Sequence, residues 1–389
     1  MLLAVGLAVD LGLLFFFKYL NFFVENICAV TGFKAHTIDV ALPLGISFYT
    51  FQIMSYIIDV YRKKYPAGRN LIEVAAYISM FPQLIAGPIV TFDEVQPRLR
   101  ERKISPANIE NGLLLFVVGL VYKVMLANQI AALWNDVMVA GVMGINTATA
   151  WLGAWGYSMQ IYFDFLGYSL MAIGMGYMLG FRFPKNFSNP YCAVSVTDFW
   201  RRWHITLGRW FREYVYIPLG GNKKGKFRLV INTFIVWFLT GLWHGAAWNF
   251  IIWGMFFFIL MMLEKFIYLR FLEKHPIIGY LYMLIIIPVS WVIFNISNLG
   301  ELKLYLLRMF GNHAVSGVPL GGMEKFVSLF GKYWWMLAIC MVCATPLPMR
   351  LISRYKNNIF LKILFVFLFW ICVYLLSVQK SNPFLYFRF

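Results

Sequence analysis

The stretch of sequence that decides the fold consists of two segments, DFWRRWHITLGRWFREYVYIPLGGN at 198–222 and GLWHGAAWN at 241–249. The first segment is rich in arginine and tryptophan, and the second lies within an apolar run. Each contains one histidine, His204 and His244. We therefore expect a basic segment at the membrane surface, followed by a histidine buried in surroundings that resemble hydrocarbon.

The composition extends this expectation to the whole chain. Of its 389 residues, 61% are hydrophobic, 19% are aromatic and only 13% are charged. A water-soluble fold has too little interior to hide so much apolar surface, whereas a lipid bilayer accepts it on the outside of the protein. The sequence predicts an all-α, polytopic membrane protein with one domain over residues 1–389. Its start, MLLAVGLAVDLGLLFFFK, lacks the basic region and cleavage site of a signal peptide.

The formal net charge of +17 does not indicate a nucleic-acid partner. The basic residues form short clusters between apolar runs, which is the pattern of cytoplasmic loops in membrane proteins. The five cysteines have apolar neighbours, so we expect small buried side chains and no disulfide or zinc site. His204 and His244 are not at ligand spacing, and no nearby carboxylate or thiol set completes a metal site.

The apolar runs predict about eight to ten membrane segments, including re-entrant and interfacial ones. The run at 71–92 suffices for about one crossing but has basic residues on both flanks. We expect it to enter and leave on one side, with a break near Gly87–Pro88 that lines a cavity; the alternative is an interfacial helix. The other predicted segments are 2–17, 41–61, 111–133, 148–181, 277–294, 333–347 and 360–376, with a mixed loop at 295–332.

The basic segment predicts one amphipathic helix on the inner membrane surface. Residues 195–198 (SVTD) fit a capping box that would begin it. Five apolar side chains follow at helical spacing on one face, and the arginines fall on the opposite face. His204 projects with the apolar side chains, so we expect it to point to the interior. The apolar face comprises Trp200, Trp203, Leu207, Trp210 and Tyr214.

The run at 229–263 predicts a hairpin of two shortened helices. It has basic residues at both ends and is too long for one crossing but short for two. His244 would lie near its apex, deep in the protein, with Trp243 and Trp248 as walls of the site.

A further ionisable side chain, Asp164, lies inside the run at 148–181. A carboxylate there needs a partner, so we expect pairing with an arginine or a tyrosine hydroxyl, or a functional role. The same run contains Gly167, Gly174, Gly176 and Gly180, whose spacing predicts close helix packing.

The two histidines are the candidates for chemistry. Neutral imidazole is the natural general base for a hydroxyl group near neutral pH. For His244 the alternative is a hydrogen-bonded structural histidine among tryptophans. For His204 the alternative is that it orients the basic helix. The segment 220–226 approaches a P-loop pattern but lacks the hydroxyl residue at position 227, so we exclude nucleotide hydrolysis.

The sequence resembles the membrane-bound O-acyltransferase (MBOAT) family, in its branch of alginate and peptidoglycan O-acetylation proteins. The resemblance covers nearly the whole chain and centres on 182–263. It is carried by FWRRWHITLGRWFREYVYIPLGGN, GLWHGAAWN, LPLGISFYTFQ with the following DVYR, FPQLIAGPIV, QIYFDFLGYSLMAIG and NPFLYFRF. It implies that His244 is the essential histidine, that His204 belongs to the signature helix, and that an acyl donor enters a funnel from the cytoplasm.

Members of this branch usually have further membrane helices before the segment that matches LGLLFFFKYLNFF. This sequence lacks them, so we expect an incomplete product or a shorter variant.

The resulting hypothesis is that the protein is an O-acetyltransferase of the bacterial inner membrane. It would take the acetyl group from cytoplasmic acetyl-CoA and bind no cofactor. The acetyl group would modify an extracytoplasmic polysaccharide such as alginate or peptidoglycan, through a periplasmic or extracellular SGNH-type acetyltransferase. Besides the histidines, the predicted substrate-binding residues are Arg201, Arg202, Arg209, Arg212, Lys223, Lys224, Trp243, Asn249 and Asp164. The alternatives are D-alanyl transfer to teichoic acid from a carrier protein, and a transporter or acyl channel.

Overall fold

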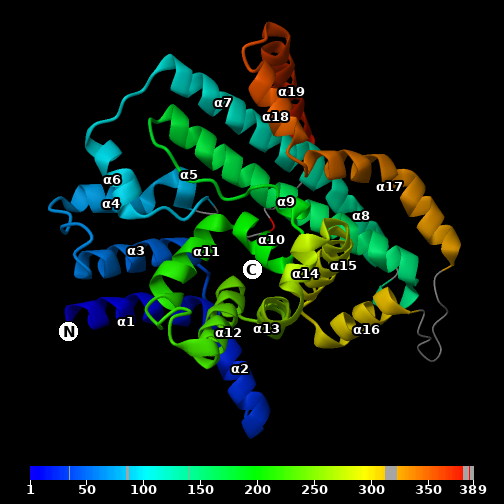
Figure 1. Cartoon of the computed structure of the whole chain (residues 1–389), viewed down its shortest axis with the longest axis horizontal. Coiled ribbons are helices and arrows are strands. Elements are labelled where there is room, and N and C mark those ends of the chain that lie inside the picture. Colours follow the sequence, from blue (N-terminus) through cyan, green and yellow to red (C-terminus); the bar gives the residue numbers. More distant parts are fainter. Residues whose placement is uncertain (35, 85–86, 140, 312–321, 380–384, 386–389) are drawn as a thin grey trace.

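The computed structural model describes residues 1–389 except 35, 85–86, 140, 312–321, 380–384 and 386–389. Every long regular element in these described ranges is a helix, which confirms the predicted all-α class (Figure 1). The terminal motif at 382–389 lies outside the described residues apart from Leu385.

The helices in the first half of the chain are α1 (Leu2–Leu14), α2 (Leu20–Thr31), α3 (Ile46–Tyr61), α4 (Leu71–Ser79), α5 (Phe81–Leu84), α6 (Phe92–Arg100), α7 (Pro106–Val121), α8 (Asn128–Met138) and α9 (Thr147–Met178). Those in the second half are α10 (Val196–Arg202), α11 (Ile205–Phe211), α12 (Gly225–His244), α13 (Trp248–Leu263), α14 (Leu269–Lys274), α15 (Pro276–Asn295), α16 (Leu299–Phe310), α17 (Met323–Cys343), α18 (Leu347–Tyr355) and α19 (Ile359–Val378). Single π-helical segments join α1 to α2 (Phe15–Tyr19), α7 to α8 (Tyr122–Ala127) and α13 to α14 (Glu264–Tyr268), and a fourth follows α11 (Arg212–Tyr216).

The molecule is a multi-pass membrane protein. Seven of the described helical stretches are long and apolar enough to cross a bilayer. They are Leu2–Thr31, Pro106–Met138, Gly225–His244, Trp248–Lys274, Pro276–Asn295, Met323–Cys343 and Ile359–Val378. The 32-residue helix α9 adds a long element at the centre of the bundle, with most of its side chains buried (Figure 1).

Helices α7 and α9 lie side by side across the centre because glycines let their backbones touch (Figure 1). A Cβ atom at Gly119 would lie 2.5 Å from the Gly167 carbonyl oxygen, and one at Gly112 would lie 2.6 Å from that of Gly174. The predicted close packing is therefore confirmed at Gly167 and Gly174. Of the other two predicted glycines, Gly176 faces the ring of Phe183 and Gly180 follows the end of α9 at a φ of 81°.

The segment predicted to be re-entrant is irregular, and its two ends meet. It forms the short helices α4 and α5, which are interrupted at Met80, and residues 87–91 are not helical. The first break thus precedes the predicted break near Gly87–Pro88. Glu73 in α4 forms an ion pair with Arg100 at the end of α6, with 2.7 Å between Oε1 and Nε. The end of α6 therefore lies beside the start of α4.

The prediction of a loop at 295–332 is wrong over much of that range, because the range contains α16 and the start of α17. Helix α16 buries Leu302, Tyr305 and Met309 on one face, a helical spacing that the flanking glycines obscured in the sequence.

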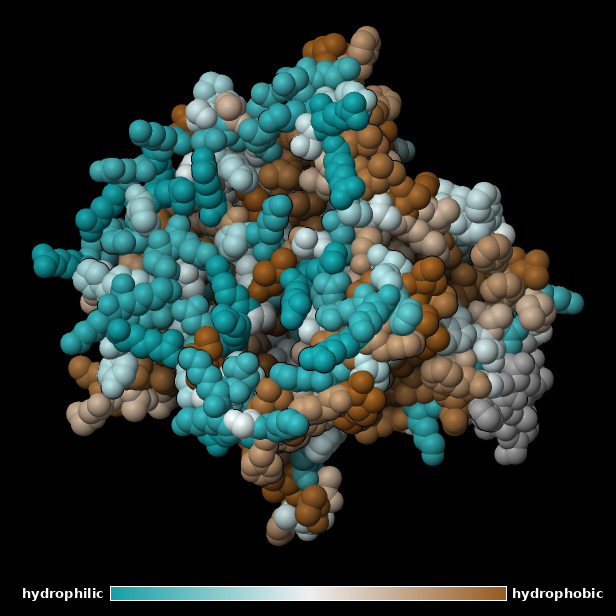
Figure 2. All heavy atoms as spheres, viewed as in Figure 1, coloured by the Kyte–Doolittle hydropathy of each residue, from teal (hydrophilic) through white to brown (hydrophobic). Residues whose placement is uncertain are grey.

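Polar and apolar residues separate on the molecular surface. Figure 2 shows hydrophilic residues gathered over α4, α6, α11 and the start of α12, with hydrophobic residues along the opposite edge. The hydrophilic area includes the basic segment, as expected for the side that contacts water.

Candidate functional site

The basic segment is not the continuous helix that the sequence predicted. Helix α10 ends at Arg202, His204 has a φ of 44° and a ψ of 51°, and α11 begins at Ile205. The left-handed backbone at His204 turns the chain between the two helices. The predicted apolar face is largely buried within the protein, with Trp203, Leu207 and Trp210 at most 4% exposed. The prediction of one helix lying on the membrane surface is therefore wrong.

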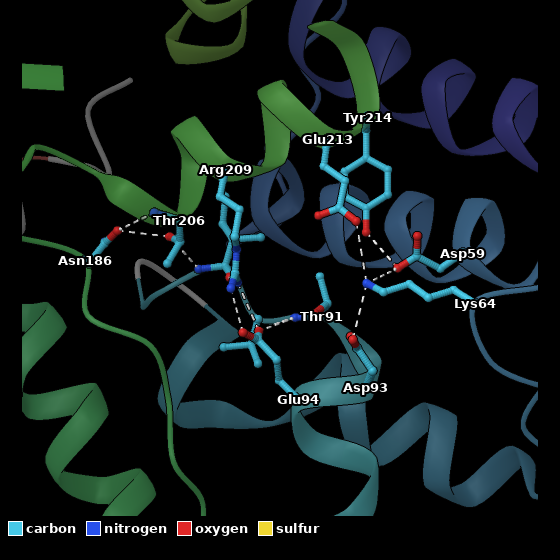
Figure 3. Close-up of polar contacts among 12 residues, drawn as sticks. Asp59, Lys64, Thr91, Asp93, Glu94, Asn186, Thr206, Arg209, Glu213 and Tyr214 are labelled. Carbon is cyan, nitrogen blue, oxygen red and sulfur yellow. Dashed lines mark hydrogen bonds and ion pairs between the residues drawn. The ribbon is translucent and has the colours of Figure 1, made fainter. Parts of the chain in front are cut away.

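Asn186 holds the break in place (Figure 3). Its Oδ1 atom accepts a hydrogen bond from Thr206 Oγ1 at 2.9 Å and lies 3.1 Å from His204 Nδ1. Its main-chain oxygen accepts from the amide of Ile205 at 2.9 Å. Because an amide oxygen can only accept, Nδ1 of His204 carries the proton and Nε2 keeps its lone pair. Nε2 has no hydrogen-bond partner among the described residues.

The start of α10 is fixed as predicted, with one addition. Ser195 Oγ accepts a hydrogen bond from the Asp198 amide at 3.0 Å, which confirms the cap. The carboxylate of Glu264, which the sequence analysis missed, accepts from the amides of Val196 at 2.6 Å and Thr197 at 2.8 Å. A buried carboxylate at a helix N-terminus satisfies amides that lack partners within the helix.

The predicted hairpin is confirmed, and His244 ends its first helix. Helix α12 has 20 residues, and the helical stretch that begins with α13 continues through α14 to Lys274, so neither arm of the hairpin is shortened as predicted. A Cβ atom at Gly241 would lie 2.5 Å from the Phe250 carbonyl oxygen, so this glycine lets the two helices pack closely next to His244.

Aromatic rings surround His244, which is 6% exposed. Its ring centroid lies 4.9 Å from those of Trp243 and Trp253 and 5.2 Å from that of Phe294. Trp243 also lies 6.0 Å from the ring of His204, so one indole contacts both imidazoles. Trp248 is not a wall of the site, since it is 49% exposed.

The first membrane helix caps the end of α12. The ammonium group of Lys18 donates to the carbonyl oxygens of Trp243 at 2.6 Å and His244 at 3.2 Å. The hydroxyl of Tyr19 donates to the Leu242 carbonyl at 2.9 Å. The last carbonyls of a helix have no partner within it, and a cation favours the negative end of its dipole. Neither residue was among the site residues predicted from the sequence, although a lysine within an apolar run was a signal.

A cavity of about 390 Å³ lies between α10, α11, α12 and the end of α13. Arg201, Arg212 and Lys265 contribute cationic groups to its lining, and His204 and Thr240 contribute polar groups closer to the core. Its lining does not include His244, which lies one helical turn beyond Thr240. The structure thus places His204, and not His244, on the cavity wall. The remaining lining residues are Thr197, Trp200, Leu207, Gly208, Phe211, Tyr216, Thr233, Val236, Trp237, Met261, Met262 and Leu269.

The predicted cations divide into two groups. Arg201 and Arg212 line the cavity, and in the described part of the chain neither forms an ion pair. Arg209 instead forms two hydrogen bonds with the carboxylate of Glu94, at 2.6 and 3.0 Å (Figure 3). Arg202 pairs with Asp198 at 2.9 Å. Arg209 and Arg202 therefore each have a carboxylate partner within the protein.

The other predicted binding residues lie outside the cavity lining. Lys223 and Lys224 are exposed in the turn before α12. Asn249 is buried and donates to the Phe294 carbonyl at 2.7 Å, which ties α13 to α15. Among the described residues, Asp164 pairs with Lys123 and with no arginine or tyrosine, and it accepts a hydrogen bond from the Leu385 amide at 2.8 Å.

A second polar network fastens the π-helical segment that follows α11 to the N-terminal part of the bundle (Figure 3). Lys64 Nζ lies 3.2 Å from carboxylate oxygens of Asp59 and Asp93 and 3.5 Å from that of Glu213. The hydroxyl of Tyr214 donates to Asp59 at 2.8 Å. These contacts hold the helix that carries the cavity wall.

Known proteins resemble this chain along its length. A sequence model of the membrane-bound O-acyltransferase family matches residues 66–299. The probable alginate O-acetylase of Pseudomonas putida is 38% identical over 100% of this chain and 84% of its own. The peptidoglycan O-acetyltransferase of Helicobacter pylori is 35% identical over 84% of this chain and 67% of its own. The teichoic acid D-alanyltransferase of Bacillus subtilis is 30% identical over 56% of this chain and 58% of its own.

The chain spans 52% to 60% of the length of the probable alginate O-acetylases from four other bacteria. The family match covers more than half of the chain, and the chain covers more than two thirds of the Pseudomonas putida relative. On both grounds, this chain belongs to the membrane-bound O-acyltransferase family.

Proposed function

We propose that the chain transfers acetyl groups from cytoplasmic acetyl-CoA for the O-acetylation of an extracytoplasmic polysaccharide. The observation that carries this proposal is the cavity, which has three cations in its lining and an imidazole with a free lone pair on its wall. The names of the two O-acetylating relatives support acetyl as the acyl group.

The cations suit the donor, because coenzyme A carries several phosphate groups. Guanidinium groups bind phosphate through paired hydrogen bonds, and Arg201 and Arg212 have such groups available. Lys265 adds a third positive charge from the opposite helix. In this proposal the phosphates remain near these side chains while the thioester extends toward His204 and Thr240.

The histidines would supply the chemistry of transfer. We assign His244 as the general base that accepts the proton of an acceptor hydroxyl as its oxygen attacks the thioester carbonyl carbon. The carbon–sulfur bond then breaks, and the thiolate of coenzyme A takes up a proton. His204 faces the donor cavity. Trp243 contacts the rings of both His204 and His244 and would fix their relative position. A periplasmic SGNH-type acetyltransferase would receive the acetyl group and complete the modification.

The test uses inverted membrane vesicles that contain the chain and its acetyl acceptor, supplied with radiolabelled acetyl-CoA. We expect His244→Ala to lower acetyl transfer by about 100-fold or more, the typical contribution of a general base. His275→Ala replaces an exposed histidine outside the site and should transfer at the wild-type rate. Full transfer by His244→Ala would refute the assigned role.

The same vesicles distinguish the alternatives. Transfer from a D-alanyl carrier protein, and none from acetyl-CoA, would support the activity named for the Bacillus subtilis relative. Permeation of a labelled solute without any covalent product would indicate a transporter or channel.

A further inference from the structure

A groove of about 650 Å³ lies at the edge of the molecule between α7 and α19, far along the chain from the residues of the candidate site. Further along both helices, Cys372 of α19 is buried against Leu120 and Val124 of the α7–α8 stretch. Toward the N-termini of the two helices, the groove lies between residues 107–117 and residues 356–369. Helix α19 is otherwise almost bare, since only 6% of its apolar window is buried.

The groove is amphiphilic along its length. Its inner part is lined by Leu113, Val117, Phe365 and other apolar residues from both helices. Its outer end is polar, with Glu110, Asn111, Lys356, Asn357 and Lys362. A long apolar tail beneath a polar head matches this division, whereas water does not fill an apolar groove in a bilayer favourably.

The charge at the polar end is positive. Glu110 and Lys362 neutralise each other, with 2.5 Å between Oε1 and Nζ. Lys356 forms no ion pair with any residue that the structure describes, and residues 325–389 of the sequence contain no aspartate or glutamate. Helix α18, which ends one residue before Lys356, carries two more cations outside the groove lining, Arg350 and Arg354. An occupant with an anionic head group is therefore favoured.

The polar end also has a defined side. Basic clusters precede both helices that form the groove, at 98–103 before α7 and at 350–356 before α19. Such clusters mark the cytoplasmic side of a membrane protein. The groove therefore opens to the cytoplasmic leaflet, whose anionic lipids bind at basic pockets between membrane helices. Figure 1 places α18 and α19 together at the rim of the molecule, where lipid can reach them.

We propose that this groove binds one anionic glycerophospholipid of the cytoplasmic leaflet. An acyl chain lies along Leu113, Val117 and Phe365, and the phosphate group is held by Lys356 with the amide groups of Asn111 and Asn357 close by. This site is independent of the proposed acyl transfer.

The test is native mass spectrometry of the purified full chain, incubated with phosphatidylglycerol or with phosphatidylcholine that has the same acyl chains. We expect a one-to-one adduct with preference for phosphatidylglycerol. Lys356→Gln should lower that preference about fivefold, the usual effect of one basic residue near an anionic lipid head. Leu113→Trp should fill the groove and lower retention of both lipids.

Lys274→Gln is the matched control, because Lys274 is an exposed cation at the end of α14 and lies outside the groove. Its lipid preference should equal that of the wild type. Equal retention of the two lipids by the wild-type chain would overturn the proposal. Unchanged lipid retention in Leu113→Trp would also overturn it. If the chain formed a dimer that Leu113→Trp dissociated, the occupant of the groove would be a second copy of the chain, which would overturn the proposal as well.

Discussion

Lys18 of the first membrane helix donates a hydrogen bond to the main-chain oxygen of His244, with 3.2 Å between the two atoms. The residues are 226 positions apart, and the contact lies where α12 ends and the hairpin turns. A π-helical segment at 15–19 displaces the helical spacing there, so that Lys18 and Tyr19 both face α12. The first helix thereby determines where the backbone of His244 lies.

The first prediction concerns this contact. Lys18→Met should lower the turnover number for acetyl transfer by about 100-fold, because a shift of about 1 Å at a catalytic group has that effect. The KM for acetyl-CoA should change little, since Arg201 and Arg212 lie on other elements. Tyr19→Phe removes one hydrogen bond and should have a milder effect in the same direction.

Asn26→Ala serves as the control for Lys18. It removes another contact between the first membrane helix and the hairpin, the 2.8 Å hydrogen bond from Trp248 Nε1 of α13, without exposing a carbonyl of α12. Its turnover should equal that of the wild type. If Lys18→Met retained normal turnover while His244→Ala was inactive, the positioning role would be refuted and the proposed activity would stand.

The second prediction separates the cations of the cavity from those beside it. Arg212→Gln should raise the KM for acetyl-CoA about tenfold, which corresponds to about 1.4 kcal/mol of binding, and leave the turnover number nearly unchanged. Lys223→Gln removes an equal charge from an exposed position outside the lining and should leave both parameters unchanged. Equal effects of the two substitutions on KM would indicate diffuse attraction in place of a defined phosphate site.

The third prediction concerns pH. Burial lowers the pKa of His204 to about 3, whereas its value in an unfolded chain is about 6.5. Below pH 6.5 the unfolded chain therefore takes up a proton that the folded chain does not, and stability falls as the pH falls. Between pH 6.5 and 4.5 this loss is roughly 2–3 kcal/mol.

The measurement is the melting temperature of the purified protein in detergent at these two pH values. The fall in melting temperature should be smaller for His204→Asn than for the wild type. His275→Asn, at an exposed histidine, should follow the wild type. An unchanged fall in the His204 variant would show that the buried imidazole does not control acid sensitivity.

The fourth prediction concerns the buried pair of Asp164 and Lys123. Asp164→Asn leaves a buried ammonium group without its carboxylate and should destabilise the protein by about 3–5 kcal/mol. The double variant Asp164→Leu with Lys123→Met removes both charges and should recover most of that loss. Thermal melts of the single and double variants test this, and a double variant less stable than Asp164→Asn would contradict it.

The local signals in the sequence located much of the site. The basic flanks at 228 and 265 implied the hairpin, and the midpoint of the run between them placed His244 near its turn. The cap at Ser195 followed from its own spacing to Asp198. These features depend on residues that are neighbours in the chain.

The parts that the sequence analysis missed depend on distant residues. The spacing of Trp200, Leu207 and Trp210 continues through the break at His204, so periodicity predicted one helix. The break depends on Asn186, which lies 18 residues earlier and is not part of a recognisable sequence motif. Likewise, Glu94 and Ile89 engage Arg209 from more than 110 residues away. A basic side chain in isolation gives no indication of such partners.

The glycine contacts between α7 and α9 have a consequence for motion. Gly112 meets Gly174 and Gly119 meets Gly167, two touching points that lie two helical turns apart. Neither helix can slide or rotate against its neighbour without a backbone clash at one of these two points. We therefore expect α7 and α9 to keep a fixed position relative to each other, so that any opening for a bulky substrate involves other elements, such as the break at His204 and the hairpin whose first helix ends at His244.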